Sequence, residues 1–493
     1  MGTVESHKFS RKELESLLDD CIEKTLAEVD VKHVLATAKK NKGYAGAVIE
    51  QSVLGYPADS AQRPDLIVDG SIPTELKTTG IKSSKNSGSV YEAKEPVSVT
   101  AVSPETIAKE NFENSKFWEK TAHMLFVFYL YSHKASSPVE YADFPIKGYE
   151  FTDFDGDDKV RLQRDWTIVH DFIQMLQERY PNEVESHYPE ISSVINSRLS
   201  VIDTAPKWPN RPRFRLKRSF VDVIVQEWYK KSLGRKSNYE KLPGRYLGYQ
   251  EIDSKCHELS KMYKGKTVRE LFDILGIKKA NGPTKQDAER IVVKMFGGEA
   301  SSMSKIDVFS KIGLVGRSFV LTRSRKGTED TKLFPIDFDE LQDVNMPFEE
   351  SSFAANFIDQ QILFVIFSEP SHDAAFSENV FEGFKRFHFD DDFIQSQVKS
   401  VWDTMRNLIF KQELKNVQKI GKNGKPIKNK NGIIQEASNW PKAKDGNVFV
   451  RGTGADSSSR NKPICINGVR MYRQNIWVRR VYLVEALKTI EYL

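Results

Sequence analysis

The chain has 493 residues, of which 39% are hydrophobic and 29% charged, a balance typical of a folded globular protein and not of a disordered or fibrous one. No run approaches the ~20 apolar residues that span a membrane, and the charged N-terminal segment lacks the apolar core of a signal peptide. The three cysteines, Cys21, Cys256 and Cys465, fit neither a zinc site nor a disulfide framework. We therefore expect an intracellular protein of two or three domains.

The first half of the chain predicts a mixed α/β domain. Hydrophobic periodicity predicts secondary structure in the following segments: helices over 11–28, 43–54 and 160–179, short strands over 65–68 and 74–78, and a buried strand over 124–131. Ser10 is the expected N-cap of the first helix, and Gly70-Ser71 the turn between the short strands. The strand at 124–131 is apolar on both faces, so we expect it at the centre of a sheet flanked by helices.

The second half repeats the landmarks of the first. The apolar run that begins at Ile362 is similar to the run that begins at Met124, and Trp402 follows Ile362 at nearly the spacing at which Trp166 follows Met124. Each half closes with a basic segment predicted to be a strand, at 214–220 and at 476–482. Three landmarks in the same order indicate two related domains, which we place at 1–232 and 249–493 with a polar linker at 233–248.

The net charge of +5, from 73 Lys and Arg against 68 Asp and Glu, decides little, but two basic stretches are informative. Residues 207–218 interleave six cations with Trp208 and Phe214. Residues 411–430 carry seven lysines interrupted by Gly421, Gly424 and Pro426, which predicts a mobile basic loop. A solvated surface explains one such stretch adequately, whereas two stretches favour phosphate binding.

One group of residues in the first half is a candidate catalytic site. Period-two geometry places Glu75 and Lys77 on the same face of a strand, and a hairpin brings Asp65 beside Glu75. Two carboxylates and a lysine suit Mg²⁺-dependent phosphodiester cleavage, in which the metal activates water and the ammonium steadies developing negative charge. The bare pattern is weak, and Asp69 is a rival to Asp65; we prefer Asp65 because Asp69-Gly70 reads as a turn.

The order of these motifs resembles the MutH family of GATC endonucleases. The resemblance rests on NKGYAGAVIEQSVLGY, then PD, ELKTT, FWEKTAHMLFVFY and FRLKRSF, and the doubled arrangement resembles the tandem, Sau-type restriction endonucleases of that family. It implies two restriction-endonuclease-like domains, the first catalytic and the second a degenerate DNA-binding and regulatory domain. The implied activity is a Mg²⁺-dependent double-strand cut at GATC that leaves 5'-phosphate ends.

The resemblance also implies roles for individual residues. Asp65, Glu75 and Leu76 would form the metal site, Lys77 would orient water, and Glu50 would complete the acidic cluster. Lys42 and Lys120 match family lysines close to the active site and the DNA, although an ordinary surface lysine is about as good an explanation for each.

The second half departs from the catalytic pattern. When the halves are aligned on Gly55 and Gly297, Val292 takes the place of Glu50, and the strand expected to carry Glu-x-Lys reads Phe319 to Arg323. We therefore expect the second copy to keep the fold and lose catalysis.

Arginine and glutamine suit the reading of base edges, and lysine and arginine suit phosphate contacts. The expected DNA-binding residues are Lys207, Arg211, Arg213, Arg215, Lys217, Arg218, Arg451, Arg470, Tyr472, Arg473, Gln474 and Arg479. The implied partners are double-stranded DNA, a second copy of the chain meeting the first transiently on a palindrome, and a cognate DNA methyltransferase as genetic partner, in a bacterial cytoplasm.

Two other functions stay open. A non-catalytic DNA clamp built from both copies would have no use for a buried acidic cluster. A mismatch-repair nicking enzyme, as the single-domain family members are, would not need the fused second domain.

Overall fold

The computed structural model describes residues 7–37, 43–57, 63–84, 89–133, 135, 137–206, 209–237, 239–372, 374–421, 423–454 and 456–493. The chain divides into two compact units: unit 1 comprises 1–252 and 304–314, and unit 2 comprises 253–303 and 315–493. The segment expected to be a linker, 233–248, belongs to unit 1. Among the described helices, none is long and apolar enough to cross a membrane.

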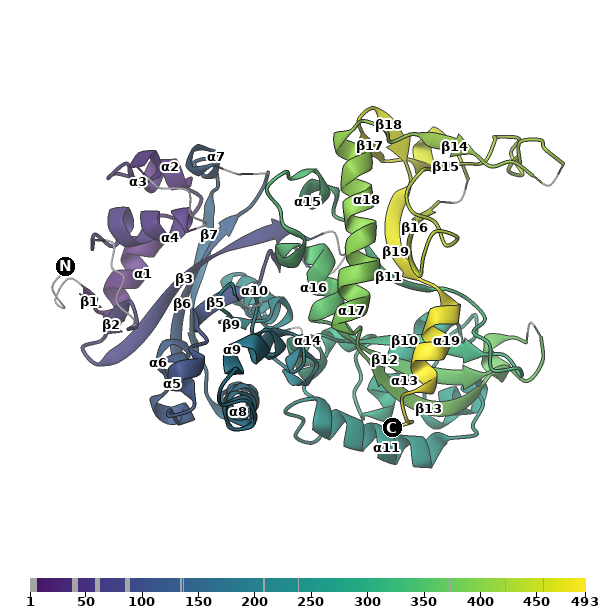
Figure 1. The fold of residues 1–493 in the computed structure, drawn as a ribbon, viewed down its shortest axis with the longest axis horizontal. Coiled ribbons are helices and arrows are strands. Elements are labelled where there is room, and N and C mark those ends of the chain that lie inside the picture. Colours follow the sequence, from purple (N-terminus) through teal and green to yellow (C-terminus); the bar gives the residue numbers. More distant parts are fainter. Residues whose placement is uncertain are drawn as a thin grey trace. The chain divides into compact units, whose positions relative to one another are not determined.

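Unit 1 is built on a mixed sheet in the order β1-β2-β3-β6-β7, with β4 also paired to β3 (Figure 1). The strands are β1 (Lys8–Phe9), β2 (Leu66–Val68), β3 (Ile72–Ser83), β4 (Tyr91–Ala93), β6 (His123–Leu130) and β7 (Ile146–Asp153). β3 runs parallel to β6 and antiparallel to β2. The predicted central strand is thus confirmed, since β6 lies between β3 and β7 and is buried along most of its length.

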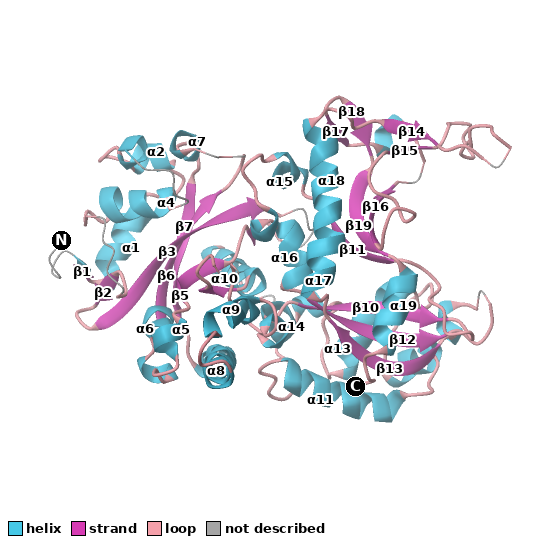
Figure 2. Cartoon of the chain, viewed as in Figure 1, coloured by secondary structure: helices cyan, strands magenta, loops and turns pink. Residues whose placement is uncertain are grey.

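Helices cover both faces of this sheet (Figure 2). Alternate β6 side chains, Leu125 and Val127, belong to a core shared with α1 (Arg11–Asp19) and α4 (Tyr44–Val48). On the opposite face, Phe128 packs against Trp228 of α10 (Arg218–Ser232), with ring centroids 4.6 Å apart. The sheet therefore holds both of its faces in apolar packing, as the alternation of β6 requires.

Two predicted helices differ from the structure in detail. The helix expected over 11–28 ends at Asp19, because Thr25 and Glu28 form a capping box that starts a separate short helix, α2 (Leu26–Val29). The helix expected over 43–54 continues from α4 into one π-helical turn, η2 (Ile49–Val53). The third predicted helix is α8 (Gly156–Arg179).

The described residues of unit 2 form two three-stranded sheets and two small hairpins. The sheets have the orders β10-β12-β13 and β11-β19-β16. Their strands are β10 (Leu314–Leu321), β11 (Thr331–Pro335), β12 (Gln361–Ser368), β13 (Val380–Phe387), β16 (Val448–Thr453) and β19 (Arg473–Val478). The helix α18 (Lys399–Phe410) buries Trp402 in the unit's core.

The repeat is visible in the backbone of the two central hairpins. The β6–β7 ladder shifts register after Phe128, opposite Gly148, and the β12–β13 ladder shifts after Ile366, opposite Gly383. Both glycines have positive φ, 154° and 140°, and each lies against an aromatic ring. Phe128 and Ile366 hold the same place in their apolar runs, since the alignment of the two runs pairs them. The two units thus share a bulge as well as a motif order.

The closing basic segments are strands for only half of their length. In unit 1, β9 (Arg213–Leu216) gives way to α10 at Arg218, and in unit 2, β19 gives way to α19 (Arg480–Lys488). Each helix begins with arginine immediately after an extended residue, Lys217 or Arg479. The predicted strands over 214–220 and 476–482 are therefore too long at their C-terminal ends.

Candidate active site

The predicted acidic residues meet at the start of β3. The β2–β3 hairpin pairs Leu66 with Thr74, which brings Asp65 next to the following strand residues. The main-chain amide of Leu76 donates a hydrogen bond to Asp65 Oδ2 at 3.0 Å. On the other side, His7 Nδ1 lies 2.8 Å from the Asp65 carbonyl oxygen. Both the side chain and the main chain of Asp65 are thereby fixed beside Glu75.

Glu75 is held between two lysines. Its side chain is 1% exposed, and Lys77 Nζ donates to Oε1 at 2.5 Å. Lys120 Nζ lies 3.0 Å from Oε2 and 3.1 Å from Oε1. Lys120 reaches the site because it lies in the last turn of α6 (Lys116–Thr121), the short helix directly before β6, and β6 pairs in parallel with β3. The expected grouping of Asp65, Glu75, Lys77 and Lys120 is present in the structure.

Burial is the main cause that raises the pKa of Glu75, and the neighbouring charge of Asp65 raises it further. The ammonium groups of Lys77 and Lys120 oppose this shift. A carboxylate so deeply buried favours a cation in direct contact.

Tyr56 is a member of this site that sequence reasoning missed. Its side chain is 2% exposed, its ring packs on His7 with centroids 4.4 Å apart, and its amide donates to the Glu50 carbonyl oxygen at 3.2 Å. Burial, followed by the charges of Glu50, Asp65 and Glu75, raises the pKa of Tyr56, so the hydroxyl keeps its proton. Within the described residues this buried hydroxyl has no hydrogen-bond partner, and neither has His7 Nε2.

The only sequence signal for Tyr56 was its place directly after Gly55, whose φ of 82° turns the chain out of η2. Glu50 lies on η2 and is partly buried. Its charge raises the pKa of the Tyr56 hydroxyl together with those of Asp65 and Glu75.

These donors fit Mg²⁺, though not as an all-carboxylate cage. Among the described residues, no group of three His, Cys, Asp or Glu side chains is close enough to hold a metal ion. Mg²⁺ keeps several waters and needs only one or two carboxylates, which Asp65 and Glu75 supply; Leu76 can add only its carbonyl oxygen. The orphan Tyr56 hydroxyl is the second indication that a polar partner belongs here.

Asp69 is placed elsewhere. It is exposed in the β2–β3 turn with φ of 47°, and its Oδ1 accepts a hydrogen bond from the Arg11 amide at 2.8 Å. Its carboxylate therefore serves the start of α1 and not the acidic cluster. Lys42, the other expected lysine, lies outside the described residues.

Several of the expected DNA-binding residues of unit 1 instead hold the fold. Lys217 is 1% exposed and donates to the Leu199 carbonyl oxygen at 2.7 Å, so its ammonium does not reach the surface. Arg215 forms an ion pair with the buried Asp203 at 2.7 Å. Arg211 and Arg213 are exposed, and Lys207 lies outside the described residues.

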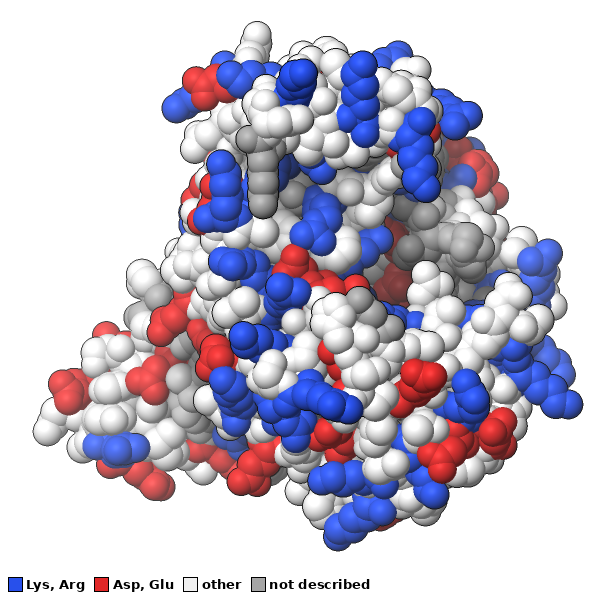
Figure 3. All heavy atoms as spheres, turned by 90° about the vertical axis from the view of Figure 1, so that its right-hand side faces the viewer, with Lys and Arg blue, Asp and Glu red and all other residues white. Residues whose placement is uncertain are grey.

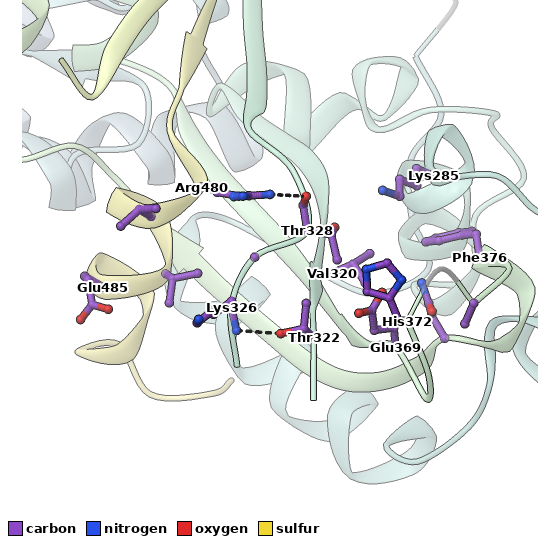
Figure 4. Close-up of a pocket in the computed structure, with 15 residues that line it drawn as sticks. Lys285, Val320, Thr322, Lys326, Thr328, Glu369, His372, Phe376, Arg480 and Glu485 are labelled. Carbon is purple, nitrogen blue, oxygen red and sulfur yellow. Dashed lines mark hydrogen bonds between the residues drawn. The ribbon is translucent and has the colours of Figure 1, made fainter. Parts of the chain in front are cut away.

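Arg218 has a structural counterpart in unit 2. Its Nε donates to the Ala93 carbonyl oxygen at 2.8 Å, and Arg480 Nη1 donates to the Thr328 carbonyl oxygen at 2.8 Å. Each arginine is the first residue of the closing helix of its unit. Arg480 lines a cavity of about 690 Å³, and Lys326, Glu369 and His372 are among the other residues that line it (Figure 4). Arg218 thus makes a structural hydrogen bond that is repeated by Arg480 in unit 2.

Among the described residues of unit 2 there is no counterpart of the acidic cluster, and the strand that replaces β3 lies earlier than predicted. The alignment of the two apolar runs pairs Tyr131 with Glu369. The Tyr131 amide donates a hydrogen bond to the Ile81 carbonyl oxygen, and the Glu369 amide donates one to the Leu321 carbonyl oxygen. Matching Ile81 with Leu321 sets Val315 and Arg317 in the places of Glu75 and Lys77, and not residues of the run from Phe319 to Arg323. Arg317 pairs with Glu289 at 3.1 Å.

The expected DNA-binding residues of unit 2 fall into two groups. Gln474 is 4% exposed and donates to the Tyr472 carbonyl oxygen at 3.0 Å, so its amide is turned inward and does not present a free edge to a base. Arg451 pairs with Asp330 at 2.8 Å, and the Tyr472 hydroxyl donates to Ser457 Oγ at 2.8 Å. Arg470 and Arg473 are exposed, and Arg479 is partly buried.

Two comparisons with known proteins bear on this site. A family model described as "DNA mismatch repair enzyme MutH" matches residues 54–165, which include Asp65, Glu75, Lys77 and Lys120. The type II restriction enzyme Sau3AI of Staphylococcus aureus is 25% identical over 384 residues, covering 74% of this chain and 73% of that protein. The mixed sheet of unit 1 is a restriction-endonuclease-like fold. The chain is therefore a relative of the MutH-like type II restriction endonucleases, which are site-specific deoxyribonucleases.

Proposed function

We propose that the protein is a restriction endonuclease that makes Mg²⁺-dependent double-strand cuts in DNA at GATC and leaves 5'-phosphate ends. The observation that carries this proposal is the burial of Glu75 between Lys77 and Lys120, with the Asp65 carboxylate beside it. A purely structural ion pair would need neither the second lysine nor the nearby acid, whose negative charge opposes the burial of Glu75.

Each residue has a distinct part in this proposal. Asp65, Glu75 and the Leu76 carbonyl oxygen would hold Mg²⁺, which polarises the scissile phosphate and lowers the pKa of water when bound. Lys77, the more exposed of the two lysines at 23%, orients the attacking water, while Lys120, at 12%, offsets negative charge on the phosphate. The protonated Tyr56 hydroxyl, which has no hydrogen-bond partner within the described residues, would donate a hydrogen bond to a water or phosphate oxygen that enters the site with the metal and the DNA.

Unit 2 would hold a second GATC copy and promote a transient dimer on DNA, so that two copies of unit 1 cut the two strands of one palindrome. The replacement of Glu75 and Lys77 by Val315 and Arg317 supports a binding role without cleavage. A methyltransferase that protects the host's own sites would be its genetic partner.

Digestion of unmethylated plasmids with one or two GATC sites tests this proposal. We expect linear fragments whose sequenced ends fall at GATC and whose rate of formation per site is higher on the two-site plasmid. Nicked circles alone would favour the repair enzyme, and DNA binding without any cleavage would favour the clamp. Equal rates per site, first order in enzyme, would contradict the role of unit 2 only.

A further inference from the structure

The segment predicted to be a mobile basic loop is a double hairpin, here called the arm and defined as residues 411–439. β14 (Asn416–Gln418) pairs antiparallel with β15 (Glu436–Ser438) at its base. Further out, the Ile427 amide donates to the Lys419 carbonyl oxygen, and the Gln435 amide to that of Ile427, at 2.8 and 2.7 Å. Three segments thus lie side by side, and Figure 1 shows them extending from the rest of unit 2.

Two Asn-Gly pairs make the tips of the arm. Gly424 and Gly432 have φ of 73° and 81°, and the chain closes around them through Gly421 to Lys425 and Asn429 to Ile433 main-chain hydrogen bonds. Asn-Gly is a strong short-range signal for a hairpin, and in both turns of the arm the glycine takes the positive φ without strain. Gly424, one of the two glycines that suggested mobility, therefore belongs to a defined turn.

The surface of the arm is basic and apolar at once. No Asp or Glu occurs between Glu413 and Glu436. Five described lysines between these two acids are exposed, and within the described residues none of them forms an ion pair: Lys415, Lys419, Lys425, Lys428 and Lys430. Four β-branched apolar side chains are also exposed, by 38–56%: Val417, Ile420, Ile427 and Ile433. The face drawn in Figure 3 carries many Lys and Arg side chains, with Asp and Glu side chains among them.

A groove of about 420 Å³ lies between the arm and the β16–β19 sheet of the same unit. The arm contributes Lys419 and Asn429 to its lining, and the sheet contributes Arg451 and Tyr472; Lys442 lies between them in the sequence. Within the described residues, the side-chain nitrogen Nδ2 of Asn429 is buried without a hydrogen-bond acceptor. Two of the acids in the groove already have partners, because Glu436 pairs with Lys462 and Asp456 with Arg460. Lys419, Lys442 and the Asn429 donor are left for an anion.

We propose that the arm and this protein groove form a clamp for double-stranded DNA. Lys419, Asn429 and Lys442 bind a phosphate of the DNA backbone. Ile420 and Ile427 contact the bases from within a groove of the duplex. The inference rests on the proposed DNA binding of unit 2 and specifies the surface that performs it. Charge complementarity selects DNA as the occupant, because a surface of lysines without acids would repel a second copy of itself. Apolar side chains beside such cations match proteins that insert aliphatic residues into a DNA groove.

The test separates the electrostatic from the apolar contribution. Binding of a duplex to the full-length protein is measured by fluorescence anisotropy in Ca²⁺ between 50 and 200 mM salt. The triple variant Lys419→Gln, Lys428→Gln, Lys430→Gln should bind at least about tenfold more weakly at 100 mM salt, with a slope of log affinity against log salt shallower by about 2 to 3. The matched control replaces Lys261, Lys264 and Lys278, which are exposed lysines of unit 2 outside the arm, by glutamine and should leave the slope unchanged.

The variant Ile420→Ser, Ile427→Ser should weaken binding severalfold at an unchanged salt slope, because no charge is removed. An unaltered slope in the lysine variant, or the same loss in its control, would overturn the proposal. A change of oligomeric state without DNA in the isoleucine variant would instead assign the apolar surface to a second copy. Cleavage by the unaltered protein is followed in parallel, so that failure of the arm and failure of the proposed nuclease are distinguishable.

Discussion

Lys120 Nζ and Glu75 Oε2 lie 3.0 Å apart, although 45 residues of sequence separate them. The contact exists because β3 and β6 run side by side in parallel, with the last turn of α6 directly ahead of β6. It brings a second cation to a carboxylate that Lys77 already contacts. The candidate active site therefore depends on the pairing of β3 with β6 as well as on the short motif of β3.

Asp65 and Asp69 are close neighbours in the sequence, and exchanging each for asparagine tests which one serves the metal site. Asp65→Asn should lower DNA cleavage by about 10²- to 10³-fold, because it removes one of two carboxylates at the site. Asp69→Asn should leave cleavage within about twofold, since its side chain bonds only the start of α1. Single-turnover cleavage of a duplex measures both rates, and equal losses would refute the choice of Asp65.

Tyr56→Phe removes one oxygen atom and little packing. We expect cleavage to fall by about 10- to 100-fold, as for loss of one positioned hydrogen-bond donor. The free energy of unfolding should stay the same or rise by about 1 kcal/mol, because the buried hydroxyl is unsatisfied. A titration with Ca²⁺ followed by protein fluorescence should show weaker binding. Tyr44→Phe, at another buried tyrosine, is the control, and unchanged cleavage with unchanged Ca²⁺ affinity in Tyr56→Phe would contradict a role in the site.

Asp222 gives a prediction about stability. Its carboxylate accepts the Ala93 amide at 2.8 Å, and burial raises the pKa of Asp222 to about 6. Because the folded state binds this proton more tightly than the unfolded state, stability is highest below about pH 4 and falls as the pH rises to 6, and the loss persists above it. Asp222→Asn should therefore raise the free energy of unfolding by about 1–3 kcal/mol at pH 8 and change it little at pH 4. Urea denaturation at both pH values measures this, and an equal change at both would exclude the assignment.

Lys442 predicts how DNA binding depends on pH. Burial, assisted by the charge of Lys419 and opposed by Asp445, lowers the pKa of Lys442 to about 8. A phosphate bound beside it would favour the charged form, so binding takes up a proton and weakens as the pH rises from 7 to 9. In Lys442→Met the affinity should be lower at pH 7 and nearly independent of pH over this range. Anisotropy titrations in Ca²⁺ give the profile, and an unchanged pH dependence in Lys442→Met would place the phosphate elsewhere.

Local spacing was enough to predict some of this site, and not the rest. Asp65, Glu75 and Lys77 could be grouped because a hairpin and a period of two fix their relation. The burial of Tyr56 could not be predicted, since its partners come from four separate segments. The basic run ending in Lys217 gave no sign that this lysine turns inward, because a strand and the start of a helix look alike in so short a segment. By contrast, the two Asn-Gly pairs were enough to predict the turns of the arm, but the many lysines around them favoured the interpretation as a mobile loop.

The central claim is that the cluster around Glu75 cleaves DNA, and the most direct test compares the unaltered protein with Glu75→Gln on a duplex containing GATC. Glutamine keeps the size of Glu75 and one of its two acceptor oxygens, while it removes the charge that pairs with both lysines and would hold the metal. The account predicts rapid double-strand cleavage in Mg²⁺ by the unaltered protein, a loss of at least about 10²-fold in the variant, and similar binding of the duplex by both in Ca²⁺. Cleavage by the variant at the rate of the unaltered protein would contradict it.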